Sequence, residues 1–259
     1  MSPFALISVS DKTNIIPFTK TLVEKFNYKI LSSGGTAQYL LEANIPVIKV
    51  SDFTKSPEIL EGRVKTLHPK IHGGILAKRS EKSHINDLSM NNFEFIDLVV
   101  VNLYPFQQKI KDNCNWDEAI ENIDIGGPSM IRSAAKNHKD VAVLINPNQY
   151  DNFLKEIAKG KLSEKFKTKL AFEAFQLTAN YDIAISNWMQ KEKEFEQKYH
   201  LETNQLIQTL RYGENPHQKA NWYGSYDAGW KKAKQLQGKE LSYNNLLDLE
   251  SALSTVLEF

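Results

Sequence analysis

The sequence has few features of secreted, membrane-bound or nucleic-acid-binding proteins. It contains one cysteine among 259 residues, so no internal disulfide can form, which suits a reducing compartment. Its 32 Lys and Arg residues nearly balance 31 Asp and Glu, and a net charge of +1 provides no broad basic field for nucleic acid. No apolar run approaches the ~18 residues that span a bilayer, and the amino terminus lacks the pattern of a signal peptide. We therefore expect a cytoplasmic protein with no nucleic-acid or membrane partner.

The overall composition is that of an ordinary globular protein. Apolar residues make up 41% of the chain and charged residues 24%. The length predicts one large domain, or one domain and part of another. The single thiol, Cys114, lies in a polar stretch, and we interpret it as a bystander and not as a nucleophile.

Short apolar runs alternate with helical patterns through the first part of the chain. Buried strands are expected at residues 4–9, 28–31, 47–50, 95–103 and 141–145. Between the first two strands, Ile15, Phe18, Leu22 and Phe26 share one helical face, and Asp11 is expected to cap that helix. This alternation predicts an α/β fold with a mostly parallel sheet flanked by helices.

Small and polar residues lie at the carboxyl ends of several of these strands. They occur at residues 8–10 (SVS), 32–35 (SSGG) and 102–104 (NLY). Parallel sheets bind ligands beyond the carboxyl ends of their strands, so these three segments indicate a common site.

The chain changes character after residue 190. A helical pattern over residues 163–188 is followed by a polar stretch at 192–208, where we expect a domain boundary. A new segment begins at residue 210, and the sequence ends inside a helical pattern. We expect a first domain over residues 1–195 and the truncated start of a second α/β domain over 205–259, with a stable fold of the latter in doubt because it buries little core.

Several residues are candidates for binding an anion. Ser33, Gly34, Gly35 and Thr36 begin a helix, where free N–H groups favour a phosphate, although such loops also serve as plain turns. Arg63 and Lys65 lie two apart and would point the same way in an extended segment, either toward one phosphate or into solvent. Lys12 follows the first strand, where it is either a phosphate ligand or a solvated charge.

Other residues are candidates for acid–base chemistry. Tyr104 either presents its phenol to a ligand or anchors packing. Asp124 either caps a helix or acts as an acid–base group, and Lys136 is either its ion-pair partner or a surface charge. His68 and His72 are four apart, but Pro69 interrupts the spacing and no third ligand is near, so structural roles are favoured over a metal site.

These segments together resemble one enzyme family. Residues 8–12 (SVSDK), 33–36 (SGGT), 62–69 (GRVKTLHP), 102–106 (NLYPF), 124–127 (DIGG) and 134–138 (AAKNH) are similar, in the family's order, to the signatures of IMP cyclohydrolase. Residues 210–218 (LRYGENPHQ) resemble the entry to the AICAR transformylase domain that is fused to it. The sequence is thus identified as similar to the amino-terminal part of the bifunctional AICAR formyltransferase/IMP cyclohydrolase family.

The resemblance implies a methylglyoxal-synthase-like fold and a dehydrative ring closure of 5-formamidoimidazole-4-carboxamide ribotide to IMP, without cofactor or metal. It implies 10-formyltetrahydrofolate as cosubstrate of the absent part of the transformylase domain, and a homodimer for the full-length form. The main alternative is a methylglyoxal-synthase-like regulatory module that binds a phosphate ligand without catalysis.

The resemblance also assigns roles to individual residues. Catalysis falls to Lys65, Tyr104, Asp124 and Lys136. Substrate binding falls to Ser8, Ser10, Lys12, Ser33, Gly34, Gly35, Thr36, Arg63, Thr66, Asn102, Gly126 and Gly127. Binding of AICAR by the second domain falls to Arg211, Tyr212 and Asn245.

Overall fold

The computed structural model describes residues 2–104, 106–111, 114–224, 230 and 233–259. The chain divides into two compact units, Met1–Met189 and Gln190–Phe259, and each is described by itself. Among the described residues, no helix combines the length and apolar character that crossing a membrane requires.

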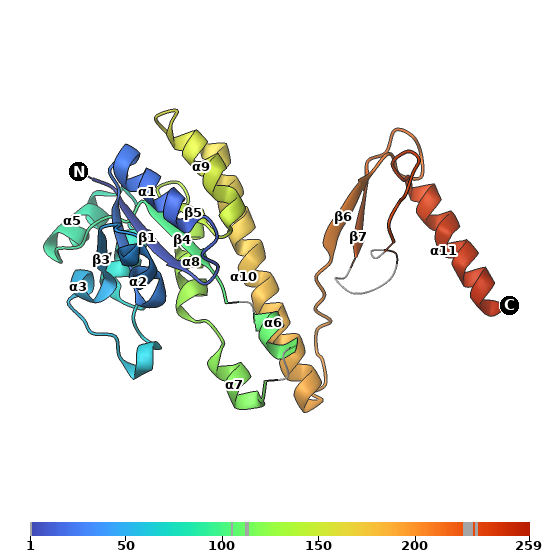
Figure 1. The fold of residues 1–259 in the computed structure, drawn as a ribbon, viewed down its shortest axis with the longest axis horizontal. Helices are drawn as coiled ribbons and strands as arrows, with labels where there is room; N and C mark the ends of the chain where they lie inside the picture. Colours follow the sequence, from blue (N-terminus) through green and yellow to red (C-terminus); the bar gives the residue numbers. More distant parts are fainter. Residues whose placement is uncertain (1, 105, 112–113, 225–229, 231–232) are drawn as a thin grey trace. The chain divides into compact units, whose positions relative to one another are not determined.

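The first unit is built on a sheet of five parallel strands with helices packed around it (Figure 1). The strand order is β3-β2-β1-β4-β5. The strands are β1 (Phe4–Val9), β2 (Lys29–Ser32), β3 (Val47–Lys49), β4 (Leu98–Asn102) and β5 (Ala142–Leu144). This arrangement confirms the predicted parallel α/β sheet.

The order of the strands creates a crevice beside β1. The chain proceeds from β1 outward to β2 and β3, and then returns to place β4 on the other side of β1. Ser8 pairs with Val101 and Val9 with Asn102, so the carboxyl ends of β1 and β4 lie level with one another. Such a reversal of strand order is where open parallel sheets bind their ligands.

Helices cover the sheet because its strands are apolar on both faces. Every residue of β4 from Leu98 to Val101 is buried. The helices are α1 (Ile15–Phe26), α2 (Gly34–Glu42), α3 (Val50–Thr54), α4 (Pro69–Leu76), α5 (Lys82–Met90), α6 (Phe106–Lys111), α7 (Trp116–Glu121), α8 (Gly126–Lys136), α9 (Tyr150–Ile157) and α10 (Glu164–Lys193). Two 3-10 turns, Leu60–Gly62 and Pro147–Gln149, complete the unit.

Two separate hydrophobic clusters hold these elements. The larger cluster lies around the sheet, where Phe18 of α1 stacks on Tyr150 of α9 with ring centroids 4.3 Å apart. The smaller one has Phe106, Ala119 and Tyr181 at its centre, and it joins α6 and α7 to the long helix α10. This second cluster supports the loops beside the crevice.

The structure corrects three local expectations. The fourth strand begins at Leu98 and not at residue 95, and Val50 begins α3 instead of ending a strand. The prediction that Asp11 caps the first helix is wrong, because α1 begins at Ile15 behind Asn14 in a left-handed conformation. The Asp11 carboxylate instead accepts the N–H of Thr13 at 2.8 Å in the turn before the helix.

The second unit is small and buries little. Strands β6 (Gln205–Leu210) and β7 (Ala220–Gly224) form an antiparallel pair, and α11 (Tyr243–Glu258) follows. Ser242 and Asn245 form a capping box at the start of α11, but no residue of this helix is buried.

Candidate functional site

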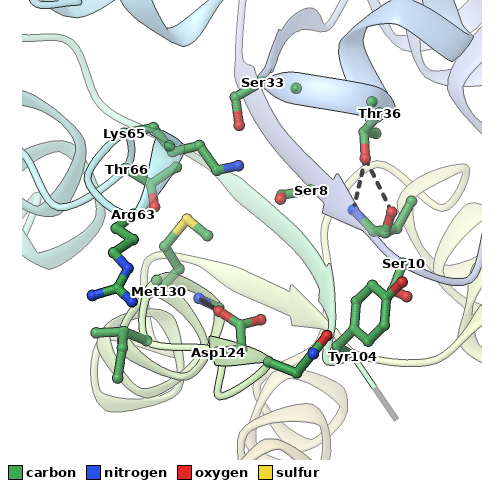
Figure 2. A pocket seen from close by; sticks show the side chains of 18 of the residues that line it. Ser8, Ser10, Ser33, Thr36, Arg63, Lys65, Thr66, Tyr104, Asp124 and Met130 are labelled. Atoms are coloured by element: carbon green, nitrogen blue, oxygen red, sulfur yellow. Dashed lines mark hydrogen bonds between the residues drawn. The ribbon is translucent and has the colours of Figure 1, made fainter. Parts of the chain in front are cut away.

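A pocket of about 770 Å³ opens at the carboxyl ends of β1, β2 and β4. Of the sixteen residues expected to bind substrate or to act in catalysis in the first unit, all but Lys136 line it. Figure 2 shows that Ser33, Ser8 and Lys65 lie along one side of the pocket and Asp124 along the other. Residues from loops far apart in the sequence therefore meet in one place.

The start of α2 forms one end of the pocket. Ser33 precedes the helix, and its buried hydroxyl has no hydrogen-bond partner in the described part of the chain. Gly34 has a φ of +52°, and a Cβ on Gly35 would meet no atom within 4 Å. The backbone N–H groups of this first turn are thus open to the pocket, as an anion site requires.

Lys65 supplies positive charge at the same end. A Cβ placed on Gly34 would lie 3.6 Å from the Lys65 Nζ, and one on Gly62 would lie 3.9 Å from it. The ammonium group therefore stands beside the start of α2. The segment that carries Lys65 is not a regular strand, since only Ile59 and Val64 pair in an isolated bridge.

Two polar side chains of the pocket hold the carboxyl end of β1. The Thr36 hydroxyl accepts the Val9 N–H at 3.1 Å and donates to the Val9 carbonyl at 3.0 Å (Figure 2). Asn102 accepts the N–H groups of Ser10 and Asp11 at 2.7 and 2.9 Å and donates to the Asp11 carbonyl at 3.0 Å. Both side chains were expected to contact substrate, but these contacts make them first of all supports of the pocket wall.

Asp124 is the partly buried carboxylate of the site. Its Oδ1 accepts the Gly127 N–H at 2.8 Å, and its own N–H donates to the hydroxyl of Tyr181 at 2.8 Å. Burial raises the pKa of Asp124, while the Gly127 N–H and the charge of Lys65 oppose that shift. A carboxylate whose pKa is moved toward neutrality is suited to proton transfer.

The two glycines at the start of α8 allow the close packing of this region. A Cβ on Gly126 would lie 2.7 Å from the Thr66 Oγ1. A Cβ on Gly127 would lie 2.4 Å from the Asp124 Oδ2 and 2.8 Å from the Leu103 Cδ2. A side chain at either position would therefore force Thr66, Asp124 or Leu103 to move, which explains the glycine pair.

Arg63 lies at the rim of the pocket. Its guanidinium forms an ion pair with Glu121 of α7, and its Nε donates to the Glu121 Oε1 at 3.0 Å. Both side chains are exposed, so the pair is open to solvent and weak. No sequence signal singles out Glu121, which is one of several carboxylates in this stretch.

Lys12 and Tyr104 complete the wall. The ammonium of Lys12 stands 5.9 Å from the centroid of the Tyr39 ring on α2. Tyr104 is partly exposed and borders the pocket beyond the end of β4 (Figure 2). An amine and a phenol thus join the hydroxyls around the cavity.

Lys136 lies elsewhere. It is the exposed last residue of α8, whereas Asp124 precedes the first. The eleven residues of α8, at about 1.5 Å each, span about 16 Å between the two, so they are not neighbours across one turn. The expected ion pair does not form in the described part of the chain, and the location of Lys136 is that of a surface charge.

The histidines have structural contacts. The Nδ1 of His68 accepts the Lys70 N–H at 3.0 Å at the start of α4. The Nδ1 of His72 lies 3.1 Å from the Ser133 Oγ, and burial lowers the pKa of His72. Among the described residues, no three His, Cys, Asp or Glu side chains gather as a metal site would require.

In the second unit, Arg211 and Asn245 border the same shallow depression. The Arg211 guanidinium carbon stands 4.9 Å from the Tyr212 ring centroid, and its Nη2 donates to the Tyr212 hydroxyl at 3.3 Å. Asn245 is committed to the cap of α11. The three predicted AICAR contacts are therefore close to one another within this unit.

Comparisons with known proteins agree with this geometry. Residues 14–129 match the family model of the MGS-like domain, and residues 134–259 match that of the AICARFT/IMPCHase bienzyme. The bifunctional purine biosynthesis protein PurH of Prochlorococcus marinus strain MIT 9515 is 72% identical over 259 residues, and that of strain NATL1A is 57% identical over 260 residues. The match covers 100% of this chain and 50% of each relative, so the chain spans about half the length of these curated relatives.

A solved structure is similar as well. The crystal structure of ForH superposes with a TM-score of 0.64 at 32% identity, over 72% of this chain and 98% of that one. The pocket, the two family models and the relatives along the whole chain lead to one conclusion: the chain belongs to the PurH family of bifunctional purine biosynthesis proteins.

Proposed function

We propose that the first unit is an IMP cyclohydrolase, which closes the six-membered ring of 5-formamidoimidazole-4-carboxamide ribotide with loss of water. The substrate carries both reacting groups, so the enzyme has to hold them together and manage two protons. Orientation of that kind is worth on the order of 7–11 kcal/mol at best. No cofactor is needed for this chemistry.

The 5′-phosphate would bind at the start of α2. The open N–H groups there and the partnerless hydroxyl of Ser33 are donors without an acceptor in the described residues. Lys65 and Lys12 border the same space, and Arg63 stands at its rim. An anion seated there would satisfy the buried Ser33 hydroxyl.

The ring closure would take place between Asp124 and Tyr104. The carboxamide nitrogen attacks the formyl carbon and forms the new C–N bond, while the Asp124 carboxylate accepts the proton released from that nitrogen. Lys65 and Tyr104 donate hydrogen bonds to the formyl oxygen as negative charge develops on it. The formyl oxygen takes up that first proton and becomes a hydroxyl group. The former formamido nitrogen then loses its own proton and forms the C=N bond as the C–O bond breaks, and the oxygen takes up this second proton and leaves as water.

One observation carries the proposal: a partly buried carboxylate of raised pKa lies in the same pocket as a helix start whose N–H groups are open to an anion. A pocket that only sensed phosphate would have no use for the partly buried Asp124 carboxylate. This favours catalysis over the regulatory module as the function of the fold.

Incubation of the chain with the formamido ribotide tests the proposal directly. We expect IMP to form, and we expect Asp124→Asn to slow its formation far more than it weakens IMP binding. Lys65→Met should affect both quantities, because the Lys65 ammonium stands beside the start of α2 and its charge also acts on Asp124. If IMP binds but none is formed from the ribotide, the regulatory alternative is correct.

The remaining expectations concern the longer protein. The relatives are named bifunctional, and the second family model bears the name of both activities. We infer a transformylase that takes 10-formyltetrahydrofolate as its cosubstrate in the complete protein, with Arg211, Tyr212 and Asn245 among its AICAR contacts. A homodimer and a cytoplasmic location belong to the same proposal.

A further inference from the structure

Tyr181 is a buried tyrosine outside the pocket. It contacts the segment that carries Asp124 and the segment that carries Tyr104. It lies in the later part of α10, and its side chain is 7% exposed. Its hydroxyl accepts the Asp124 N–H at 2.8 Å. This contact joins α10 to the loop before α8 over 57 positions of sequence.

The ring of Tyr181 reaches the other side of the site. It packs edge-to-face against Phe106, with centroids 6.2 Å apart, and Phe106 also packs against Trp188 at 5.4 Å. The N–H of Phe106 donates to the carbonyl of Tyr104 at 2.7 Å. The same side chain therefore touches the segments that carry both Tyr104 and Asp124.

We propose that Tyr181 is a positioning residue for Asp124: its hydroxyl fixes the backbone from which the carboxylate reaches into the pocket, and its ring fixes the segment that carries Tyr104. This inference rests on the proposed function for the identity of the reaction. It adds a residue that never touches the substrate and that acts through the two groups that do.

The electrostatic surroundings of Asp124 make the inference measurable. Lys65 acts on Asp124 from the loop after the 3-10 turn at Leu60–Gly62, and Tyr181, which is itself under the charge of Asp182, contacts it from α10. The Gly127 N–H binds the carboxylate from α8. A loop released from Tyr181 would let water reach the carboxyl group, and hydration would lower its pKa toward the ordinary value.

Tyr181→Phe is the appropriate variant, because it removes the hydroxyl and keeps the ring in the smaller hydrophobic cluster. We expect kcat for IMP formation to fall about 5- to 10-fold, with KM and the dissociation constant of IMP within about 2-fold of the wild type. The acidic limb of the pH profile of kcat should move to lower pH. A residue with only a packing role would leave that limb in place.

Tyr150→Phe is the matched control. Tyr150 is also buried, and its hydroxyl has no hydrogen-bond partner among the described residues. Its removal should leave kcat, the pH profile and the Asp124 titration unchanged. Thermal unfolding of both variants shows whether either has lost its fold.

The carboxyl titration of Asp124 separates the two proposals, because it needs no substrate. Protein labelled with ¹³C at aspartate is titrated by NMR, and the Asp124 signal is identified by its loss in Asp124→Asn. We expect a lower Asp124 pKa in Tyr181→Phe than in the wild type. An unchanged titration overturns the positioning role even where ring closure is confirmed, and a wild type that forms no IMP overturns the proposed function even where the titration shifts.

Discussion

Gly127→Ala should damage the site by a single added carbon. The new Cβ would stand 2.4 Å from the Asp124 Oδ2 and 2.8 Å from the Leu103 Cδ2. Contacts below 3.0 Å are essentially not seen for real Cβ atoms, so the carboxylate or the helix must move by at least about 0.6 Å. The carboxylate cannot move freely, because its other oxygen accepts the Gly127 N–H at 2.8 Å.

The expected magnitude follows from opposing effects. Overpacking costs about 1–3 kcal/mol, and the lower flexibility of alanine in a helix returns about 0.5–1 kcal/mol. We expect a net loss of about 1–2 kcal/mol in the free energy of unfolding. The rate of ring closure should fall further, since a misplacement near 1 Å costs on the order of 100-fold.

Gly73→Ala provides the control, because Gly73 lies in α4 away from the pocket and its Cβ would make only an ordinary contact of 3.4 Å with Phe93. We expect this variant to be more stable than the wild type by about 0.5–1 kcal/mol and fully active. Urea unfolding and initial rates of IMP formation measure both effects. If Gly127→Ala matches Gly73→Ala in stability and rate, the packing argument for the start of α8 is refuted.

Three further substitutions test other contacts of the pocket. Asp124→Asn should raise the thermal midpoint at neutral pH. Burial raises the pKa of Asp124, so the protonated carboxyl group favours the folded state, and this stability is lost as pH rises through the folded pKa. Asparagine has no such proton to lose. The gain should vanish below about pH 4, and a gain that grows with acidity would contradict the sign. Thr36→Val removes the partner of the Val9 N–H and carbonyl and should cost about 1–3 kcal/mol in urea unfolding, against no change if water replaces the hydroxyl. Ser33→Ala should stabilise the free protein slightly, by up to about 0.5 kcal/mol, and weaken IMP binding about 5- to 10-fold by calorimetry. Equal binding would show that the hydroxyl does not meet the phosphate.

Much of the fold was predictable because its signals are local. The run Leu98–Val101 is apolar on both faces, which is typical of a strand inside a parallel sheet, and the structure buries it there. The boundaries were less accurate. Asp11 has the chemistry of a helix cap, but three further residues, one of them Asn14 in a left-handed conformation, separate it from α1. A residue that can cap a helix indicates that a helix begins nearby, but not at which position. The path of the backbone decides where the helix begins.

The site was predictable to the extent that its residues follow strands. Ser8 and Asn102 lie at the carboxyl ends of β1 and β4, Ser33 comes directly after β2, and parallel strands bring such residues to one edge. Glu121 and Tyr181 carried no such signal, since one is a carboxylate on a short helix and the other an aromatic residue of a long one. Their contacts depend on how α7 and α10 pack, and no spacing in the sequence encodes that.

The pocket concentrates features that work against the stability of the protein. Leu60 and Glu61 have φ values of 53° and 55°, a conformation unfavourable for non-glycine residues, in the turn that leads to Arg63 and Lys65. Asp124 is ionised less readily than in water, and the Ser33 hydroxyl is buried without a partner in the described residues. The apolar sheet beneath them offsets these costs, because its strands are buried on both faces. A substitution that relieves one of these features should therefore stabilise the free protein and weaken ring closure. A substitution in the hydrophobic core should instead lower the stability of the protein.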